Sequence, residues 1–373
     1  MKTGLLTGSF DPVTFGHLDI FERAATTFDK VIVGVGNNPS KKYLFSDEAR
    51  AAFIRQHVKA PNIEVAVIGS GLTADFAYEQ NAVLIKGVRM GGSDFDYERL
   101  MHDINHAHQA GLETFILPCS PHLHWISSSA AKEVCKLHGL TETFVPLAVK
   151  EQMERRLTGA LRIGLTGTIA SGKSTLARQL CDAGLSDGTP IHNIDLDKLG
   201  HEILFERTEP AYVLLRGKLQ ADLGLSDWSR KSVGAKVFGD ASARAVLNAA
   251  MEQPLRTRLR YELTGKTGVI LFNGALLVEA GWAKLVNNNF LLLDVPEELQ
   301  RERLLARGHT AAQIQSRIGA QFTTQTKLLN IRRHIAADGH GQSCVIQTGT
   351  CLDESFQYAR RWLDELWQME TDG

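Results

Sequence analysis

The residues from Leu161 to Leu180 read LRIGLTGTIASGKSTLARQL. An apolar run typical of a buried strand leads into the turn Gly167 to Ser174, and a stretch typical of a helix follows. The turn matches G-x-x-x-x-G-K-S, a pattern whose backbone N–H groups cradle phosphates, whose lysine reaches the β- and γ-phosphates and whose last hydroxyl reaches Mg²⁺. The stretch therefore predicts a nucleoside triphosphate site in a parallel α/β fold.

The same alternation of short apolar runs and helix-period stretches continues along the whole chain. The predicted strands are residues 4–7, 31–35, 63–68, 83–85 and 114–117, then 161–166, 191–194, 269–272, 290–295 and 344–347. Such βα alternation predicts parallel sheets with helices on both faces. We place a boundary at about Thr158, giving an α/β domain over residues 1–157 and a second over 161–369. Residues 211–260 of the second domain are expected to form a helical cap.

Length and composition agree with two domains and limit the classes of partner. The chain has 373 residues, 43% of them hydrophobic, which is enough for two cores. Its 41 basic and 42 acidic residues leave no excess charge to hold nucleic acid or an anionic membrane. Five scattered cysteines without metal-site spacing suit a reducing compartment. With no apolar segment of signal-peptide or membrane-spanning type, we expect a cytoplasmic protein.

A second group of phosphate-binding features lies in the first domain. The sequence SFDPVTFGH, residues 9–17, follows the first strand and begins the first helix. NPSKK (38–42), KGVR (86–89) and ISSS (126–129) follow other strands, so all four clusters should meet at one edge of the sheet. His17 can donate a hydrogen bond to a phosphate held at the helix start. Taken alone, the first loop equally fits a turn with a capping histidine.

These motifs, together with residues 94–98, give Met1 to about Leu157 a strong resemblance to bacterial phosphopantetheine adenylyltransferases. The resemblance implies a dinucleotide-binding-like nucleotidyltransferase fold and adenylyl transfer from ATP to 4′-phosphopantetheine, without a covalent enzyme intermediate. It implies catalytic roles for His17 and Lys41, and binding of the nucleophilic phosphate by Ser9 and Lys41. The implied ATP contacts are Phe10, His17, Arg89, Tyr97, Glu98, Ser127, Ser128 and Ser129. Lys86 is a substrate contact where the family usually has arginine.

The second domain carries further polar groups after its strands. Asp195 and Asp197 end the strand after the phosphate loop, where a carboxylate could hold Mg²⁺ or accept a proton; Asp195 equally fits a helix N-cap. With LLVE at 276–279 and Q-x-x-R-x-x-x-R at 300–307, residues 162–367 resemble dephospho-coenzyme A kinases, implying a P-loop kinase fold with a helical substrate and lid region.

That second resemblance implies transfer of the ATP γ-phosphate to the ribose 3′-hydroxyl of dephospho-coenzyme A. The implied catalytic residues are Asp197, as base, and Lys173. Glu279 would contact the substrate, and Ser174 and Asp195 would hold Mg²⁺. The implied ATP contacts are Gly167, Ile169, Ala170, Ser171, Gly172, Lys173, Ser174, Thr175 and Arg307. The product of the first reaction is the substrate of the second, so the two resemblances support each other.

The sequence also departs from the second family. Thr168 and Ala170 stand where glycines are usual, and Thr324 stands where a lid arginine is usual. Arg317, Lys327 or Arg332 could replace that cation, although for each of them a solvated helix charge is the favoured interpretation. An adenylyltransferase joined to a weak or regulatory nucleotide-binding domain therefore remains an alternative, as does another nucleotidyltransferase for the first domain. The expected partners are small molecules, with homo-oligomerisation through the first domain as an option.

Overall fold

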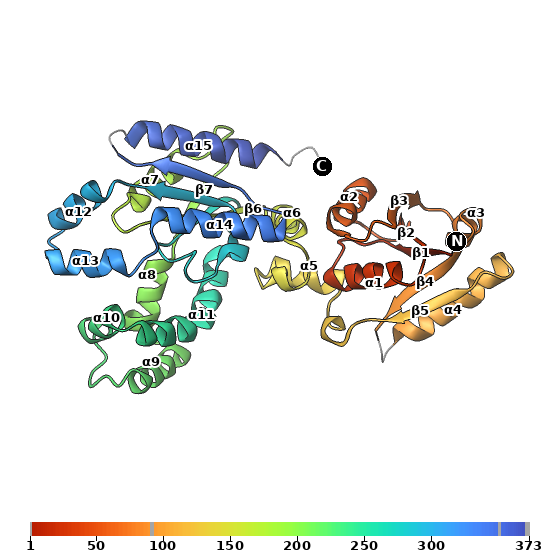
Figure 1. The fold of residues 1–373 in the computed structure, drawn as a ribbon, viewed down its shortest axis with the longest axis horizontal. Helices are drawn as coiled ribbons and strands as arrows, with labels where there is room; N and C mark the ends of the chain where they lie inside the picture. The colour runs from red at the N-terminus through yellow and green to blue at the C-terminus, as the bar shows by residue number, and fades with distance from the viewer. Residues whose placement is uncertain (1, 90–92, 350–351, 370–373) are drawn as a thin grey trace. The chain divides into compact units, whose positions relative to one another are not determined.

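The computed structural model describes residues 2–89, 93–349 and 352–369, which form two compact units (Figure 1). The first unit ends at Leu157 and the second begins at Thr158. In the described residues each unit contains one five-stranded parallel sheet with helices on both faces. The prediction of two α/β domains is therefore confirmed.

The first unit alternates strands and helices from its start. Its elements are β1 (Thr3–Gly8), α1 (Phe15–Ala25), β2 (Lys30–Gly36), α2 (Asp47–His57), β3 (Ile63–Gly69), α3 (Thr73–Glu79), β4 (Ala82–Val88), α4 (Ser93–His108), β5 (Thr114–Pro118), α5 (Ser128–Lys136) and α6 (Leu147–Thr158), with short 3-10 helices at Pro121–Leu123 and Thr141–Thr143. The sequence did not predict α3, a short helix without a side-chain cap.

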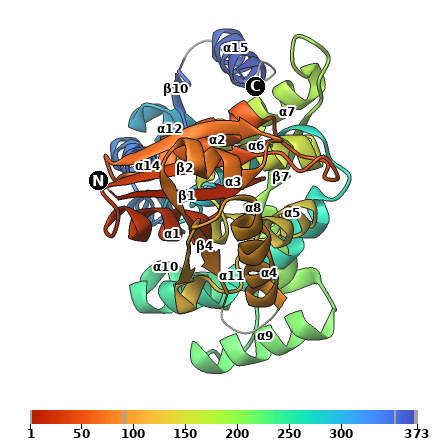
Figure 2. The same cartoon turned by 90° about the vertical axis from the view of Figure 1, so that its right-hand side faces the viewer.

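The sheet of the first unit has the order β3-β2-β1-β4-β5. Figure 2 labels its three middle strands, β2, β1 and β4. Side chains along β1 alternate between two cores: Leu6 packs with residues of α1 and α2, and Leu5 packs with residues of α3. The helices after β1 and β2 thus cover one face, and the helix after β3 covers the other. β1 and β4, neighbours in the middle of the sheet, mark the point where the chain changes face, which is where such sheets bind ligands.

The second unit has the same kind of sheet with more helices. Its elements are β6 (Ala160–Gly167), α7 (Lys173–Ala183), β7 (Ile191–Asp195), α8 (Leu196–His201), a π-helix at Glu202–Glu206, α9 (Pro210–Asp222), α10 (Arg230–Gly239), α11 (Ala241–Leu263), β8 (Gly268–Asn273), a 3-10 helix at Ala283–Val286, β9 (Phe290–Asp294), α12 (Glu297–Ala306), α13 (Ala311–Gly319), α14 (Thr324–Asp338), β10 (Ser343–Gln347) and α15 (Leu352–Gln368).

The strand order in the second unit is β10-β9-β6-β8-β7, with the phosphate-loop strand β6 in the centre. β6 is buried along its whole length, because α7 and α15 pack on one face while α8, α11 and α14 pack on the other. The helices α9, α10 and α11 fill the region for which the sequence predicted a helical cap. Among the described helices, none combines the length and the hydropathy needed to cross a membrane.

Candidate active sites

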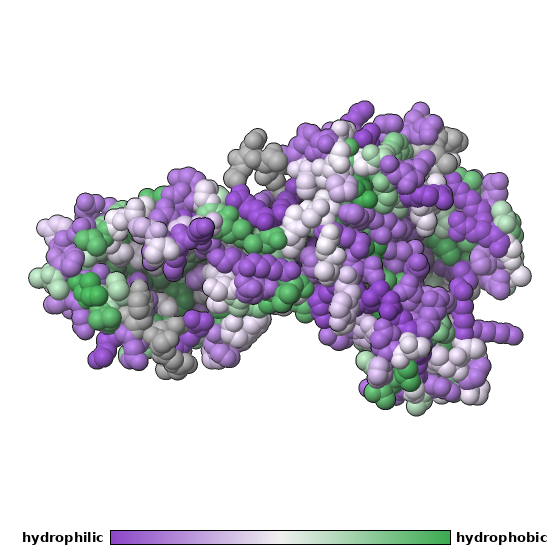
Figure 3. Space-filling model, turned by 180° about the vertical axis from the view of Figure 1, so that it is seen from behind, coloured by the Kyte–Doolittle hydropathy of each residue, from purple (hydrophilic) through white to green (hydrophobic). Residues whose placement is uncertain are grey.

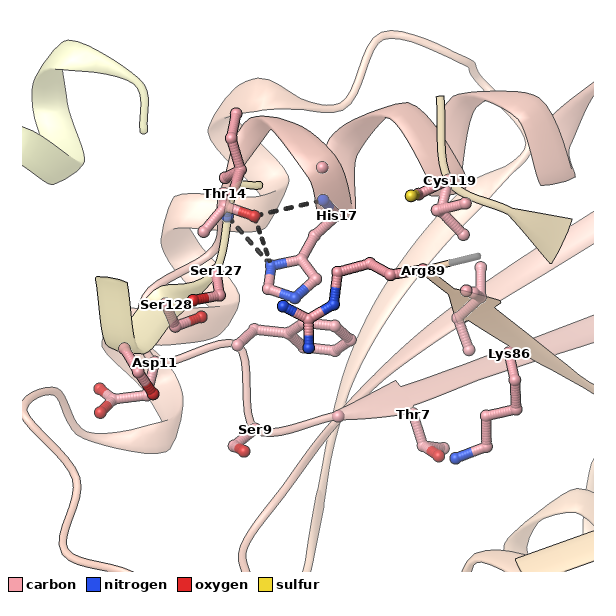
Figure 4. Close-up of a pocket in the computed structure, with 18 of the residues that line it drawn as sticks. Thr7, Ser9, Asp11, Thr14, His17, Lys86, Arg89, Cys119, Ser127 and Ser128 are labelled. Carbon is pink, nitrogen blue, oxygen red and sulfur yellow. Dashed lines mark hydrogen bonds between the residues drawn. The ribbon is translucent and has the colours of Figure 1, made fainter. Parts of the chain in front are cut away.

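A pocket of about 510 Å³ opens where β1 and β4 end, at the change of face in the first sheet (Figure 4). Its walls bring together residues from all four predicted clusters. Among those lining it are Ser9, Phe10, His17, Lys41, Lys86, Arg89, Glu98, Ser127, Ser128 and Ser129. Chain segments that are more than a hundred positions apart in the sequence therefore surround one cavity.

The His17 imidazole is oriented by the residue that caps its own helix. Thr14 is the N-cap of α1, and its backbone N–H donates to Nδ1 of His17 over 3.1 Å. Because a backbone N–H can only donate, Nδ1 is unprotonated, and the proton of the neutral ring is on Nε2. Phe10 lies edge-on to the ring at 5.1 Å between centroids. The imidazole therefore offers an N–H donor at its far side, where Figure 4 shows the second ring nitrogen.

The charge state of His17 follows from its surroundings. Burial, and then the nearby charge of Arg89, lower the pKa of His17 from 6.5 to about 4. The ring is consequently neutral at pH 7 and acts as a hydrogen-bond donor rather than a cation. Figure 4 shows the Arg89 guanidinium beside the imidazole, so Arg89 supplies the positive charge at this place.

Lys86, Ser127 and Ser128, which also line the pocket, have partners that fix their side chains. Lys86 pairs with Glu98, Nζ to Oε2, at 3.4 Å, so Glu98 orients a cation of the pocket. The Ser127 hydroxyl caps α5 by accepting from the N–H of Ala130, and Ser128 donates to the carbonyl of Pro12. The Ser128 contact holds the N-terminus of α5 against the loop that follows β1. The side chain of Tyr97 lies outside the described residues.

Arg50 is an organising residue that the sequence reasoning missed. Its side chain, on α2, is 1% exposed and donates to the carbonyls of Ser9 (2.5 Å), Gly36 (3.2 Å) and Ser46 (3.3 Å). It also lies over the ring of Tyr43 at 4.3 Å. Arg50 thus ties the end of β1 to both ends of the loop that carries Lys41. The signal in the sequence that could have indicated this role was the position of Arg50 on the side of α2 that faces inward.

The phosphate loop of the second unit has the backbone of a phosphate-binding turn. Gly167 (φ 151°) approaches the carbonyl of Leu293 so closely that an added Cβ would lie 2.5 Å from it, and Gly172 (φ 96°) precedes α7. Ala170 also has a positive φ, 61°, although it carries a side chain. That side chain packs in a small core with Leu304 and Ile314. The departure from glycine at position 170 therefore combines a strained backbone with a buried methyl group.

Lys173 folds back over the turn. Its ammonium donates to the carbonyls of Gly167 at 3.1 Å and Thr168 at 2.9 Å. Burial lowers the pKa of Lys173 to about 8, although the nearby Asp197 carboxylate opposes that change. The lysine is thus largely charged at pH 7. Ser171 lies in the same turn, and its carbonyl accepts from Thr348; Ser174 and Thr175 are in the first turn of α7.

The two aspartates after β7 have different environments. Asp195 is the N-cap of α8, its carboxylate accepting from the N–H of Lys198 at 2.9 Å, so the capping role that the sequence left open is present. Burial raises the pKa of Asp197, and the charge of Lys173 opposes the rise. Asp197 and Glu279 both line a cavity of about 530 Å³, whose other walls come largely from apolar residues of α8, the π-helix and α11.

Charged residues of α12 and α14, where the sequence predicted a lid, also have specific partners. Lys327 is 0% exposed and donates to Glu279 at 2.5 Å and to the carbonyl of Ala275 at 2.7 Å, so the expectation of a solvated helix charge is wrong for Lys327. Arg303 donates to the carbonyl of Ala170 at 3.1 Å. Arg307 ends α12, and its charge contributes to the lowered pKa of Lys173.

Comparison with known proteins agrees with this division of the chain. Residues 5–134 match the family model described as cytidylyltransferase-like, and residues 161–341 match the model for dephospho-CoA kinase. A phosphopantetheine adenylyltransferase of Clostridium perfringens is 44% identical over 160 residues, covering 42% of this chain and 96% of the relative.

Two solved structures also match. The crystal structure of TT1252 from Thermus thermophilus has 26% identity and a TM-score of 0.44, covering 56% of this chain and 98% of that one. A dephospho-CoA kinase from Campylobacter jejuni has 18% identity and a TM-score of 0.35, covering 56% of this chain and 97% of that one.

The fold and the two sites define the class of protein: a nucleotidyltransferase unit followed by a P-loop kinase unit, and hence a bifunctional transferase. The chain belongs to the phosphopantetheine adenylyltransferase family, and its second unit is a dephospho-CoA kinase domain.

Proposed function

We propose that the chain performs the last two steps of coenzyme A synthesis. The first unit would join ATP and 4′-phosphopantetheine to give dephospho-coenzyme A and pyrophosphate, and the second would phosphorylate the 3′-hydroxyl of that product. The observation that carries the proposal is the neutral His17, whose Nε2–H lies beside the Arg89 guanidinium in a pocket that Lys41 and Lys86 also line.

In the first step an oxygen of the 4′-phosphate attacks the α-phosphorus of ATP. The bond from that phosphorus to the bridging oxygen breaks, and pyrophosphate leaves with its electron pair. We assign Ser9 and Lys41 to the attacking phosphate, and His17 and Arg89 to the charge that develops on the α-phosphate. Such preorganised donors act mainly in the transition state.

The remaining contacts of the first step hold the nucleotide. Ser127, Ser128 and Ser129 line the pocket at the start of α5, and a helix N-terminus favours the negative charge of the β- and γ-phosphates. Lys86, paired with Glu98, would contact the substrate. We assign Phe10, Tyr97 and Glu98 to the surroundings of the nucleotide.

In the second step Asp197 would accept the proton of the acceptor hydroxyl as that oxygen attacks the γ-phosphorus, and ADP would leave. Its place on the wall of the apolar cavity supports this role, and a raised pKa brings a base closer to the pH at which it works. Lys173 would exchange its loop carbonyls for the β- and γ-phosphates, and the loop from Gly167 to Thr175 would hold them, with Arg307 nearby.

The residues present fit Mg²⁺, which would come with ATP. Ser174 offers a hydroxyl and Asp195 a carboxylate, both oxygen donors of the kind Mg²⁺ prefers. Among the described residues there is no cluster of three His, Cys, Asp or Glu side chains that could hold a metal ion. The ion would be held mainly by phosphates and water. When bound, the ion would neutralise charge on the transferred phosphate.

Three further points belong to the same proposal. We assign the adenylyltransferase to residues 1–157 and the kinase to residues 161–369. A cytoplasmic location is supported by the free thiols of Cys119, Cys181 and Cys344. Homo-oligomerisation through the first unit is supported by exposed apolar side chains on α4 and the edge strand β5, namely Leu100, Ile104, Phe115 and Ile116. On the face in Figure 3, apolar residues lie in small groups among hydrophilic ones. The molar mass of the protein in solution tests whether it forms homo-oligomers.

A coupled assay tests the function. Purified protein, incubated with phosphopantetheine, ATP and Mg²⁺, should release pyrophosphate and accumulate coenzyme A, with dephospho-coenzyme A as a transient. Accumulation of dephospho-coenzyme A alone would refute the kinase step and leave a regulatory nucleotide-binding unit. Preferred turnover of a nicotinamide or lipid head-group phosphate would instead assign the first unit to another nucleotidyltransferase. Lys173→Ala should stop the second step and leave the first unchanged.

A further inference from the structure

The short connection between α13 and α14 touches two functional regions through neighbouring residues. The side-chain oxygen of Gln321 accepts from the backbone N–H of Ile169, in the phosphate loop, at 2.9 Å. The backbone N–H of the next residue, Phe322, donates to Oε1 of Glu279 at 3.0 Å. Two consecutive residues, Gln321 and Phe322, thus connect the phosphate loop to the carboxylate of Glu279. This carboxylate lies on the wall of the 530 Å³ cavity that Asp197 also lines.

Glu279 is held on one side and unpartnered on the other. Its Oε1 accepts both from Phe322 and from the buried ammonium of Lys327, at 2.5 Å. Its Oε2 is buried and has no hydrogen-bond partner. A buried charged oxygen without a donor destabilises the folded state. Because Glu279 lines the cavity next to the proposed base, a hydroxyl or amide N–H of the phosphoryl acceptor is the donor that this oxygen suits.

The phosphate loop needs support at the place where Gln321 reaches it. Gln300 donates to the carbonyl of Ile169 at 2.8 Å, while Gln321 accepts from its N–H, so the peptide planes on both sides of Ile169 are fixed. The following residue, Ala170, has the strained φ of 61°. Such conformations persist where surrounding contacts over-determine them. Losing the Gln321 contact would let this turn relax away from the shape that holds phosphates.

We propose that Glu279 and Gln321 are positioning residues that couple acceptor binding to ATP binding in the second unit. An acceptor that donates to Oε2 of Glu279 fixes the Gln321–Phe322 peptide, and Gln321 then holds the phosphate loop in its ATP-binding shape. This inference rests on the proposed kinase function and goes beyond it by predicting positive coupling between the two substrates.

Initial rates of coenzyme A formation from dephospho-coenzyme A test the coupling on the full chain. Pyrophosphate is left out, so that the first unit cannot run in reverse. In the wild type, the KM for ATP should be at least about fivefold lower at a saturating concentration of dephospho-coenzyme A than at a low one. A fivefold change is the lower end of the coupling usually found between two binding sites. In Gln321→Ala, the KM for ATP should be high and independent of the acceptor, with kcat at saturation changed less than about threefold.

Matched variants separate coupling from a general loss of structure. Gln315→Ala removes an exposed glutamine of α13 that contacts Arg301 and not the phosphate loop, and should behave as the wild type. Glu279→Gln should raise the KM for dephospho-coenzyme A about tenfold and abolish the coupling, while Glu298→Gln, exposed on α12, should do neither. If Glu279→Gln unfolds, the double variant Glu279→Gln with Lys327→Met removes the buried charge pair as a unit and is measured instead.

The outcomes are distinct. A Gln321→Ala enzyme that keeps the wild-type dependence of the ATP KM on the acceptor would overturn the coupling. So would a wild type that makes coenzyme A with an ATP KM independent of the acceptor. A wild type that makes no coenzyme A from dephospho-coenzyme A would overturn the kinase function itself, and the coupling with it.

Discussion

The His17 imidazole and the phosphate loop of the second unit are held by partners at very different distances in the sequence. In the first unit the imidazole of His17 is oriented by Thr14, three residues before it, through a capping box. In the second unit the phosphate loop is held at Ile169 by Gln321 and at Ala170 by Arg303, which are 152 and 133 positions away. The imidazole of the first site is therefore oriented by a local contact, whereas the phosphate loop of the second site depends on distant segments being in place.

The difference extends to what each site must do when ATP binds. His17 already carries its proton on Nε2, so its donor is ready before the nucleotide arrives. The Lys173 ammonium is bound to loop carbonyls and must exchange them for phosphates. We infer that changes in α12 to α14 will affect the kinase through its loop, while the transferase will respond mainly to changes inside its own pocket.

His17→Ala should give the largest effect, and it should impair the adenylyltransferase alone. Removing a preorganised donor at the developing charge should lower adenylyl transfer about 10²- to 10³-fold. Phosphorylation of dephospho-coenzyme A should stay at the wild-type rate, since His17 lies in the first unit. Pyrophosphate release and coenzyme A formation measure the two steps separately. His108→Ala, an exposed histidine at the end of α4, is the control. Normal transfer by the His17 variant would refute its role.

Asp197→Asn should have the opposite selectivity: it should impair the kinase and spare the adenylyltransferase. The substitution keeps the size of the side chain and removes its ability to accept a proton, so kinase turnover should fall about 10²-fold or more. Adenylyl transfer should be unaffected. Because burial raises the pKa of Asp197, the wild-type kinase should lose activity on the acid side at a higher pH than an ordinary carboxylate would dictate. Asp182→Asn, exposed on α7, is the control; an unchanged kinase rate in Asp197→Asn would place the base elsewhere.

The pH dependence of the first step sharpens the comparison further. With its pKa lowered from 6.5 to about 4, His17 stays neutral from pH 8 down to about pH 5, and its protonation should cause no loss of transferase rate in that range. The sign follows from burial, which disfavours the charged ring. Rates between pH 5 and 8, together with imidazole NMR titration of the wild type against His17→Ala, provide the measurement. A His17 resonance titrating near pH 6.5 would contradict the assignment.

The sequence predicted those features that depend on local patterns. The β-strands were found because each is a short apolar run between turn residues, and the pockets were located because polar clusters follow those strands. For β6 this worked fully, since the strand, the glycine-rich turn and the helix are consecutive. The strand predicted at residues 4–7 and the SFDPVTFGH loop are consecutive in the same way. The pocket lies where this strand meets β4, at the point where the connecting helices change from one face of the sheet to the other.

The features that escaped prediction depend on contacts between distant residues or on local geometry finer than a pattern. Arg50 looks like one charge among several on an amphipathic helix, yet it is buried because three carbonyls converge on it. Lys327 is buried because Glu279, 48 positions away, pairs with it. The tautomer of His17 depends on a single hydrogen bond, which no residue pattern specifies.

Ala170→Gly should give the smallest effect, because two opposing contributions nearly cancel. Glycine relieves the left-handed backbone at φ 61°, worth roughly 1–2 kcal/mol. It also loses a buried methyl group that packs with Leu304 and Ile314, about 0.8 kcal/mol, and adds about 0.4–1 kcal/mol of unfolded-chain entropy. The free energy of unfolding should therefore change by less than about 1 kcal/mol, and the Tm of the second unit by less than about 4 °C. The kinase KM for ATP should stay within about twofold, since Gln300 and Gln321 fix the neighbouring Ile169. A large gain in Tm with weaker ATP binding would instead show that strain at Ala170 is what shapes the loop.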